Sequence, residues 1–288
     1  MMITTEMIKK LREQSGAGIM ICKKTLVEAG GDMQKAVEIL KEMEAVLAAK
    51  KAERATFEGL VSAYISEDKR TGAMVELACE TDFVAANRAF VEFGKNLARQ
   101  AATADPKDVE ECLAEQYEAD KDVSVREAIT SLIARFGENI ALNKIVRFSS
   151  QNGFVQSYVH NGGKIGVLVE LKPGGAGKTE EAVAKEIAMQ VAAANPLFLE
   201  RADADNEVVE KELPAYRDQA QRDGKPAQIV DKIVLGKIAK FYRQNCLLEQ
   251  PWIKDENQTV ARFLKGSSEK LDAKIEIVKF VRFECGKD

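Results

Sequence analysis

The sequence predicts an α+β protein in which a three-helix module precedes two duplicated α+β subdomains, the second carrying an inserted antiparallel helical hairpin. Three observations support this prediction. Residues 1–55 show helical spacing of apolar side chains between cap signals. The rest of the chain repeats itself at an offset of 94 positions, and the second copy is longer by about forty residues. We therefore expect domains at 1–55, 56–150 and 151–288.

The N-terminal module is expected to contain three helices separated by short breaks. Thr4 can accept a hydrogen bond as the N-cap of the first helix, and the run Ser-Gly-Ala-Gly at 15–18 ends that helix. A second helix is expected over 19–28. Asp32 is then the N-cap of the third helix. The run 48–55, rich in Ala and Lys, is expected to be its exit into a linker.

Each half of the core is expected to begin with a β-hairpin. Three residues of the first half recur 94 positions later: Gly59, Val61 and Tyr64 as Gly153, Val155 and Tyr158. The apolar runs 72–77 and 166–171 share the same offset. Apolar runs on either side of a polar turn indicate two paired antiparallel strands.

A helix and a closing strand are expected to complete each half. The helices are predicted over 82–102 and 179–194, and each ends near a proline. The closing strands, 140–148 and 275–283, share the pattern Ile-x-x-x-Lys-x-Val-Arg-Phe. Each half is too small to bury its own sheet well, so we expect the two halves to pack together.

The extra length of the second half maps to about 200–250. Two stretches there, 208–221 and 229–242, are helical in pattern, with a turn at 223–226 between them. Pro214 is expected to kink or break the first helix. The second helix carries an apolar stripe, which consists of Ile229, Ile233, Ile238 and Phe241. A projecting antiparallel helical hairpin is the simplest structure for this insert.

Composition excludes several classes of function. The 288 residues carry a net charge of −4, so the chain has no overall basic field and no direct nucleic-acid partner is expected, although a local basic patch stays open as an alternative. The apolar runs are too short to span a membrane, and the start lacks a signal or transit pattern, which favours a cytoplasmic protein. Five scattered cysteines predict reduced, mostly buried thiols. With a single histidine, neither a metal site, a cofactor nor a catalytic constellation is expected.

Two further patterns support neither phosphate binding by a glycine-rich loop nor catalysis by paired carboxylates. The tract 173–179, Pro-Gly-Gly-Ala-Gly-Lys-Thr, is similar to a phosphate-binding loop, but Lys172 occupies the position of the first glycine. We interpret the tract as a connector between strand and helix. The acidic pairs at 110–111 and 180–181 lie at polar helix starts or faces, without a histidine, serine or metal cluster nearby.

Two places are candidate contacts, and each leaves an alternative open. The segment 79–85, Cys-Glu-Thr-Asp-Phe-Val-Ala, joins an apolar strand to a helix. Thr81 or Asp82 can be the helix N-cap, and Phe83 either plugs the core or stands exposed as a functional aromatic. His160 lies in a polar turn after a strand, where it is either simply solvated or contacts a partner.

Two signatures give the chain a resemblance to the elongation factor Ts family. The run 11–20, Leu-Arg-Glu-Gln-Ser-Gly-Ala-Gly-Ile-Met, followed by Cys-Lys-Lys-Thr-Leu at 22–26, resembles the start of that family. The run 81–85, Thr-Asp-Phe-Val-Ala, is similar to its central motif. The order of the parts also resembles the family over essentially the whole chain. Ile21 departs from the pattern, since an aspartate is common there.

The resemblance implies a guanine-nucleotide exchange factor, without bond chemistry of its own, for the translation GTPase elongation factor Tu in its GDP-bound and nucleotide-free states. Thr81, Asp82, Phe83 and Val84 would dislodge Mg²⁺ from the partner, with Phe83 as the wedge. The N-terminal module would resemble a ubiquitin-associated fold and dock on the partner.

The remaining contacts are also implied by the resemblance. Arg12 and Met20 would lie at the contact of the N-terminal module, and His160 would be a second contact of the core. The hairpin would touch other domains of the partner or support a homodimer or a heterotetramer. The alternative is a scaffold without exchange activity, or an RNA-binding accessory protein, built from the same folds.

Overall fold

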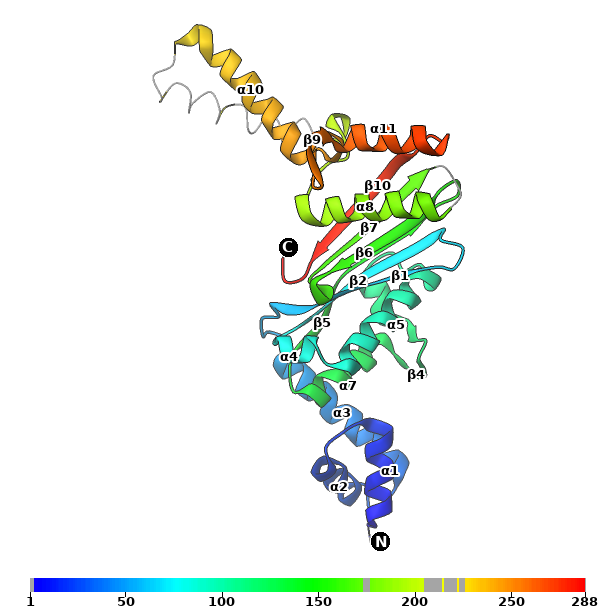
Figure 1. The fold of residues 1–288 in the computed structure, drawn as a ribbon. Coiled ribbons are helices and arrows are strands. Elements are labelled where there is room, and N and C mark those ends of the chain that lie inside the picture. Colours follow the sequence, from blue (N-terminus) through cyan, green and yellow to red (C-terminus); the bar gives the residue numbers. More distant parts are fainter. Residues whose placement is uncertain (1–2, 173–176, 205–213, 215–221, 223–225, 288) are drawn as a thin grey trace.

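The computed structural model describes residues 3–172, 177–204, 214, 222 and 226–287, and it is an α+β structure, as the sequence predicts. Figure 1 shows an elongated molecule with the N-terminal helices at one end and helix α10 projecting from the other. Two three-stranded β-sheets lie between them, and the described residues also form two two-stranded sheets, β3-β4 and β8-β9. The candidate contacts are held by these sheets and by the helices that cover them.

Three helices form the N-terminal part of the chain: α1 (Thr5–Ser15), α2 (Ile19–Glu28) and α3 (Met33–Lys51). The caps agree with the sequence, because the side chain of Thr4 accepts from the N–H of Met7 and that of Asp32 from the N–H groups of Gln34 and Lys35. The helices enclose a small apolar core made of Leu11, Cys22, Leu26, Ala29 and Ala36. The prediction of a linker from residue 48 was wrong, because α3 continues to Lys51.

The first sheet has the order β1-β2-β5 and is antiparallel throughout. Its strands are β1 (Glu58–Ile65), β2 (Thr71–Cys79) and β5 (Ile140–Ser149). Helix α5 lies on one face and buries Phe90, Phe93 and Leu97. The remaining elements of this half are α4 (Asp82–Ala85), α5 (Arg88–Ala104), α6 (Val109–Ala114), β3 (Gln116–Tyr117), β4 (Asp120–Ser124) and α7 (Val125–Phe136).

The second sheet has the order β10-β7-β6 and is also antiparallel. Its strands are β6 (Phe154–His160), β7 (Ile165–Lys172) and β10 (Glu276–Glu284). The other elements of this half are η1 (Asn161–Gly163), α8 (Lys178–Ala194), η2 (Arg201–Asp203), α10 (Ala227–Asn245), η3 (Leu247–Glu249), β8 (Pro251–Trp252), β9 (Asp255–Thr259) and α11 (Val260–Leu271). Helix α8 covers this sheet as α5 covers the first.

The duplication extends beyond the hairpins into the buried polar contacts. Gln100 of α5 and Gln190 of α8 are both buried, and each donates its side-chain N–H to the carbonyl of a short strand, at Gln116 and Pro251. Each also accepts a backbone N–H two residues further along that hairpin. Buried amide groups need hydrogen-bond partners, and the two halves provide equivalent partners for their buried glutamines.

The two sheets pack against each other through apolar faces. Their shared core consists of Val61, Met74, Phe148, Val155, Leu168 and Phe283. A Cβ at Gly166 would overlap Val61, so a glycine is required at this close approach. The contact is reciprocal at its border, because Lys144 lies over the ring of Phe283 and Lys279 over that of Phe148. This packing supplies the burial that neither sheet achieves alone.

Two helix predictions need correction. The helix predicted over 82–102 is two helices, because the chain turns at Ala86 and the side chain of Asn87 caps α5 by accepting the N–H of Ala89 at 2.9 Å. On α10 the buried side chains are Val230 and Val234, whereas Ile229 of the predicted stripe is exposed. The first helix of the predicted hairpin, at 208–221, lies almost wholly outside the described residues, as does most of the tract 173–179.

Glu44 on α3 is a buried carboxylate at the joint between the N-terminal helices and the core. It is 6% exposed and accepts a hydrogen bond from the hydroxyl of Ser131 on α7 at 2.8 Å. Burial raises the pKa of Glu44 above its ordinary value of 4.5, and the Ser131 hydrogen bond and the charge of Lys41 oppose that shift. The charged form therefore destabilises this joint at neutral pH.

Replacing Glu44 by glutamine is expected to stabilise the protein at pH 7. The cost of the buried charge is fully present above the raised pKa of the folded state and disappears as the pH falls towards 4.5, where the unfolded state also takes up its proton. Glu44→Gln should raise the melting temperature at pH 7 by about 2–4 °C, and the difference from wild type should shrink as the pH falls towards 4.5. A lower melting temperature for the variant at pH 7 would show that the Ser131 hydrogen bond to the charged form outweighs burial.

Candidate protein-binding site

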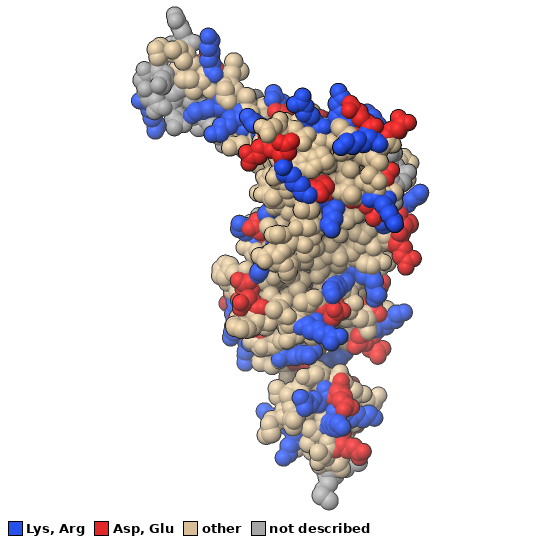
Figure 2. All heavy atoms as spheres, viewed as in Figure 1, with Lys and Arg blue, Asp and Glu red and all other residues tan. Residues whose placement is uncertain are grey.

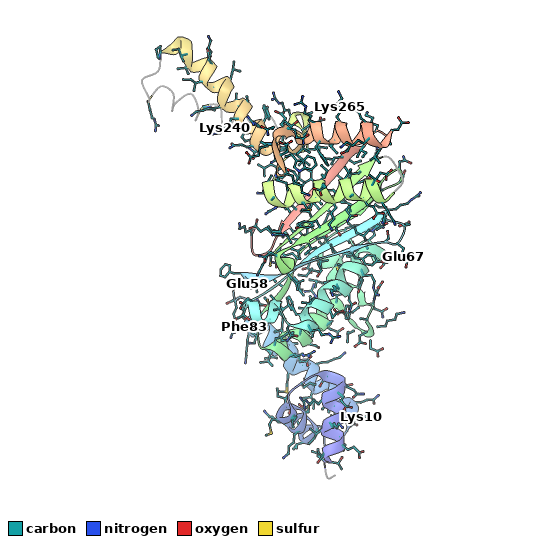
Figure 3. The ribbon with its side chains drawn as sticks, viewed as in Figure 1. Lys10, Glu58, Glu67, Phe83, Lys240 and Lys265 are labelled. Atoms are coloured by element: carbon teal, nitrogen blue, oxygen red, sulfur yellow. The ribbon has the colours of Figure 1, made fainter. Side chains whose placement is uncertain are left out.

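The turn between β2 and α4 presents Phe83 to solvent. Thr81 is the N-cap, and its hydroxyl oxygen accepts the N–H of Val84 at 3.4 Å. Val84 points into the core, while the side chain of Phe83 is 83% exposed. Figure 3 shows Phe83 at the outer edge of the molecule. Phe83 is therefore exposed and does not plug the core, while its role as a functional contact stays a prediction.

The carboxylate of Glu138, which precedes β5, the neighbour of β2 in the sheet, holds this turn in place. One of its oxygens accepts the hydroxyl of Thr81 at 2.6 Å, and the other accepts the backbone N–H of Thr81 at 3.0 Å. Glu138 lies between α7 and β5, 57 positions along the chain from Thr81. Hydrogen bonds to a charged acceptor are among the stronger ones in proteins, so a single side chain fixes the backbone that carries Phe83.

A second carboxylate, that of Glu80, binds in the reverse direction, from the β2–α4 turn to the α7–β5 turn. Glu80 accepts the backbone N–H of Asn139 at 2.6 Å and pairs with Arg54 at 3.5 Å. The side chain of Asn139 in turn donates to the backbone carbonyls of Ala52 and Arg54. The β2–α4 turn, the α7–β5 turn and the segment after α3 are thereby tied together.

Cys79 supports the same turn without being reactive. Its thiol is buried and donates to the carbonyl of Thr81 at 3.2 Å. Burial, reinforced by the negative charge of Glu138, raises the pKa of Cys79 to about 12. The thiolate is the nucleophilic form of cysteine, so this side chain stays protonated and serves as a hydrogen-bond donor.

His160 is the last residue of β6 in the second sheet. This end of the sheet lies next to the start of β1 in the first sheet. His160 is exposed, and its Nδ1 lies 2.9 Å from the hydroxyl of Tyr158. After the turn η1, Lys164 forms an ion pair with Glu58 at the start of β1. Glu58 pairs with Cys79 across the first sheet. The same end of the core therefore carries His160 and the turn 81–84.

Arg12 and Met20 lie elsewhere, on the N-terminal helices. Met20 is 74% exposed, and its neighbours Ile19 and Ile21 are also exposed, which leaves an apolar surface at the start of α2. Arg12 is exposed on α1. Figure 1 shows α1 and α2 separated from α4 by α3 and α7. The structure brings the turn 81–84 and His160 to one end of the core, and it places Arg12 and Met20 on a separate part of the molecule.

The residue that sequence reasoning missed is Glu138. Its local signal is the run Gly-Glu-Asn at 137–139, where Gly137 ends α7 in the left-handed conformation. A helix end of this kind indicates a turn but does not reveal which distant backbone the glutamate binds. Its function is visible only because the folded sheet brings β2 and β5 together.

Three features of the described residues bear on the kind of site: groups that could hold a metal ion, helices that could span a membrane, and surface charge. Within the described ranges, no group of three or more His, Cys, Asp or Glu side chains is placed to hold a metal ion. In the part of the chain that the structure describes, no helix is both long and apolar enough to cross a membrane. Figure 2 shows acidic and basic side chains interspersed over the visible face of the core.

Comparisons with known proteins agree on one family. The family model described as elongation factor TS matches residues 80–287, which include both Thr81 and Glu138. Elongation factor Ts of Clostridium botulinum (strain Alaska E43) is 49% identical over 285 residues, covering 99% of this chain and 93% of that protein. With the same coverage, elongation factor Ts of Clostridium perfringens (strain ATCC 13124) is 50% identical, and that of Clostridium novyi (strain NT) is 49% identical.

Glu138→Ala is expected to loosen the turn 81–84 while the protein remains folded. The substitution leaves the N–H and the hydroxyl of Thr81 without their charged acceptor, which should cost about 1–3 kcal/mol of unfolding free energy. Amide hydrogen exchange at Thr81 should become faster, because Glu138 is the acceptor of that N–H.

A matched control for this variant is Glu110→Ala. Glu110 forms an exposed ion pair with Arg126, so its loss should cost no more than about 1 kcal/mol. Thr81 exchange should be unchanged in the control. If Glu138→Ala also left the exchange of Thr81 unchanged, Glu138 would not be what holds the turn.

Proposed function

The chain belongs to the elongation factor Ts family, and on that premise we propose that Phe83 carries the exchange step on elongation factor Tu. Membership of this family identifies the chain as a translation elongation factor that promotes guanine-nucleotide exchange on elongation factor Tu. In our proposal the ring of Phe83 inserts into the partner near its phosphate site and displaces Mg²⁺. In GTPases Mg²⁺ is coordinated by the nucleotide phosphates and neutralises their charge, so its displacement weakens the hold on GDP.

The observation that carries this proposal is the exposure of Phe83 on a restrained turn. A large apolar side chain that is 83% exposed makes almost no contribution to the core of its own protein. The two hydrogen bonds that Thr81 donates to the carboxylate of Glu138 fix the backbone that carries the ring of Phe83. A ring already held in position loses less conformational freedom on binding, which favours its use as a contact.

Asp82 and Val84 have supporting roles in this proposal. Asp82 is exposed in the first turn of α4, next to Phe83. Val84 is buried and anchors α4 to the first core. Thr81 provides the cap that starts the helix. The four residues thus form one unit, in which two anchor the turn and two face the partner.

The remaining contacts belong to the same proposal. Met20, with the exposed apolar side chains beside it, and Arg12 dock the N-terminal module, a ubiquitin-associated-like unit, on the partner. His160 provides a second contact from the core. The insert at 200–250 touches other domains of the partner or supports a homodimer or heterotetramer. We place the protein in the cytoplasm, where translation elongation takes place.

The exchange itself follows from thermodynamic linkage. If the chain weakens GDP binding by some factor, GDP weakens binding of the chain by the same factor. A transient ternary complex that can decay in either direction is then sufficient for fast exchange. This mechanism requires no acid, base, nucleophile or metal on the chain, since it changes an affinity and breaks no bond.

Release of a fluorescent GDP analogue from elongation factor Tu tests the proposed function. In stopped-flow experiments, the release rate should increase with the concentration of this chain and then saturate. In excess chelator the partner already lacks Mg²⁺, so the acceleration ratio should fall several-fold below its value with Mg²⁺ present. No acceleration with a cognate partner would contradict exchange activity, and an unchanged ratio in chelator would contradict displacement of Mg²⁺.

Phe83→Ala should separate function from folding. Because the ring is exposed, the free energy of unfolding should change by no more than about 0.5 kcal/mol. The maximal release rate should fall about tenfold or more, because the bound chain lacks the ring that acts on the nucleotide site, and a barrier higher by about 1.4 kcal/mol corresponds to a tenfold lower rate. A control is Leu197→Ala, which removes another exposed apolar side chain, after α8. If Phe83→Ala exchanged nucleotide as fast as this control, Phe83 would not be the wedge.

A further inference from the structure

A second aromatic side chain, Phe57, stands exposed at the same end of the core as Phe83. It directly precedes β1 and is 74% exposed. Nothing in the local sequence pattern distinguishes Phe57 from a residue that begins a buried strand. Among the described residues, Phe57 and Phe83 are the two phenylalanines that stand out as exposed large apolar side chains.

The strand pairing places Phe57 beside the turn that carries Phe83. Glu58, the next residue, pairs with Cys79 at the end of β2, and paired strands lie about 4.8 Å apart. Arg54 pairs with Glu80 at 3.5 Å, and α4 lies against β1. Figure 3 shows Glu58 and Phe83 at the same edge of the molecule.

The backbone of Phe57 is held although its ring is exposed. Asn139 donates to the carbonyl of Arg54 at 2.8 Å on one side, and Lys164 pairs with Glu58 on the other. The C-terminal turn packs against the carbonyl of Phe57, because a Cβ at Gly286 would overlap that oxygen. The N–H of Gly286 is in turn fixed by the buried carboxylate of Glu76. Phe57 therefore resembles Phe83 in being an exposed ring on a restrained backbone.

The charges next to Phe57 are already paired within the chain. Glu58 is neutralised by Lys164, and Glu80 by Arg54. A partner that contacts this surface thus meets two aromatic rings flanked by internal ion pairs. Apolar and aromatic groups of a partner are complementary to the two rings, while the exposed carboxylate of Asp82 beside Phe83 is available to a basic or polar group.

We propose that Phe57 and Phe83 form one continuous contact surface for elongation factor Tu, with Phe57 binding an apolar patch beside the site that receives Phe83. This inference rests on the proposed function and adds a residue to it. The occupant is the same partner because the two rings lie on adjacent, mutually tied segments. Phe83 acts on the nucleotide site, whereas Phe57 contributes affinity.

The test is the dependence of GDP-analogue release on the concentration of full-length chain, for wild type and Phe57→Ala. Losing one buried aromatic contact should raise the half-saturating concentration about tenfold. The maximal rate should stay within about twofold, because Phe57 does not act on the nucleotide. Phe57→Tyr should restore most of the affinity, and Leu197→Ala should match wild type. The melting temperature of Phe57→Ala should equal that of wild type.

The outcomes separate this inference from the proposed function. No acceleration by wild type would contradict both. Acceleration by wild type with an unchanged half-saturating concentration for Phe57→Ala would overturn the role of Phe57 alone. A large loss of melting temperature in Phe57→Ala would overturn it too, since the ring would then be a core residue. Sedimentation of the chain alone tests whether a second copy of the chain binds this surface instead. If wild type forms a dimer that Phe57→Ala does not form, the ring of Phe57 serves self-association and the proposal is wrong.

Discussion

The hydrogen bonds from Thr81 to Glu138 are the interaction on which the presentation of Phe83 depends. They join the end of β2 to the turn before β5, and they fix the cap from which α4 starts. A ring on a loose turn would have to be ordered at the moment of binding, which costs affinity. With the cap fixed inside the protein, that ordering is complete before any partner arrives.

The duplicated core provides the support for this turn. Two antiparallel sheets pack face to face, and the packing is reciprocal, with Lys144 over Phe283 and Lys279 over Phe148. The strand ends at one side of this core carry the turn 81–84, and the ion pair between Glu58 and Lys164 joins them to the turn after His160. A rigid core that holds exposed aromatic and imidazole groups at one end is suited to contact another protein through these side chains.

The local features of this structure were predictable from the sequence, as was the packing of the two halves against each other, but the individual long-range side-chain contacts were not. The caps at Thr4 and Asp32 follow from neighbouring residues, and so does the repeat of strands and helices. The break before Asn87 was missed because apolar spacing continues through it, although an asparagine N-cap is a readable signal. The exposure of Phe83 and its support by Glu138 depend on contacts between residues far apart in the chain, which no local pattern encodes. The domain boundaries and the partner contacts remain predictions.

A double-mutant cycle between Phe83 and Glu138 tests the central claim most directly, with the maximal rate of GDP-analogue release as the measured quantity. If Glu138 acts by holding the ring, Glu138→Ala should slow exchange when Phe83 is present and have little further effect in a Phe83→Ala background. Strong non-additivity of this kind is the signature of two residues that work through one interaction. Losses that simply add would contradict the account, because Glu138 would then influence exchange independently of the ring.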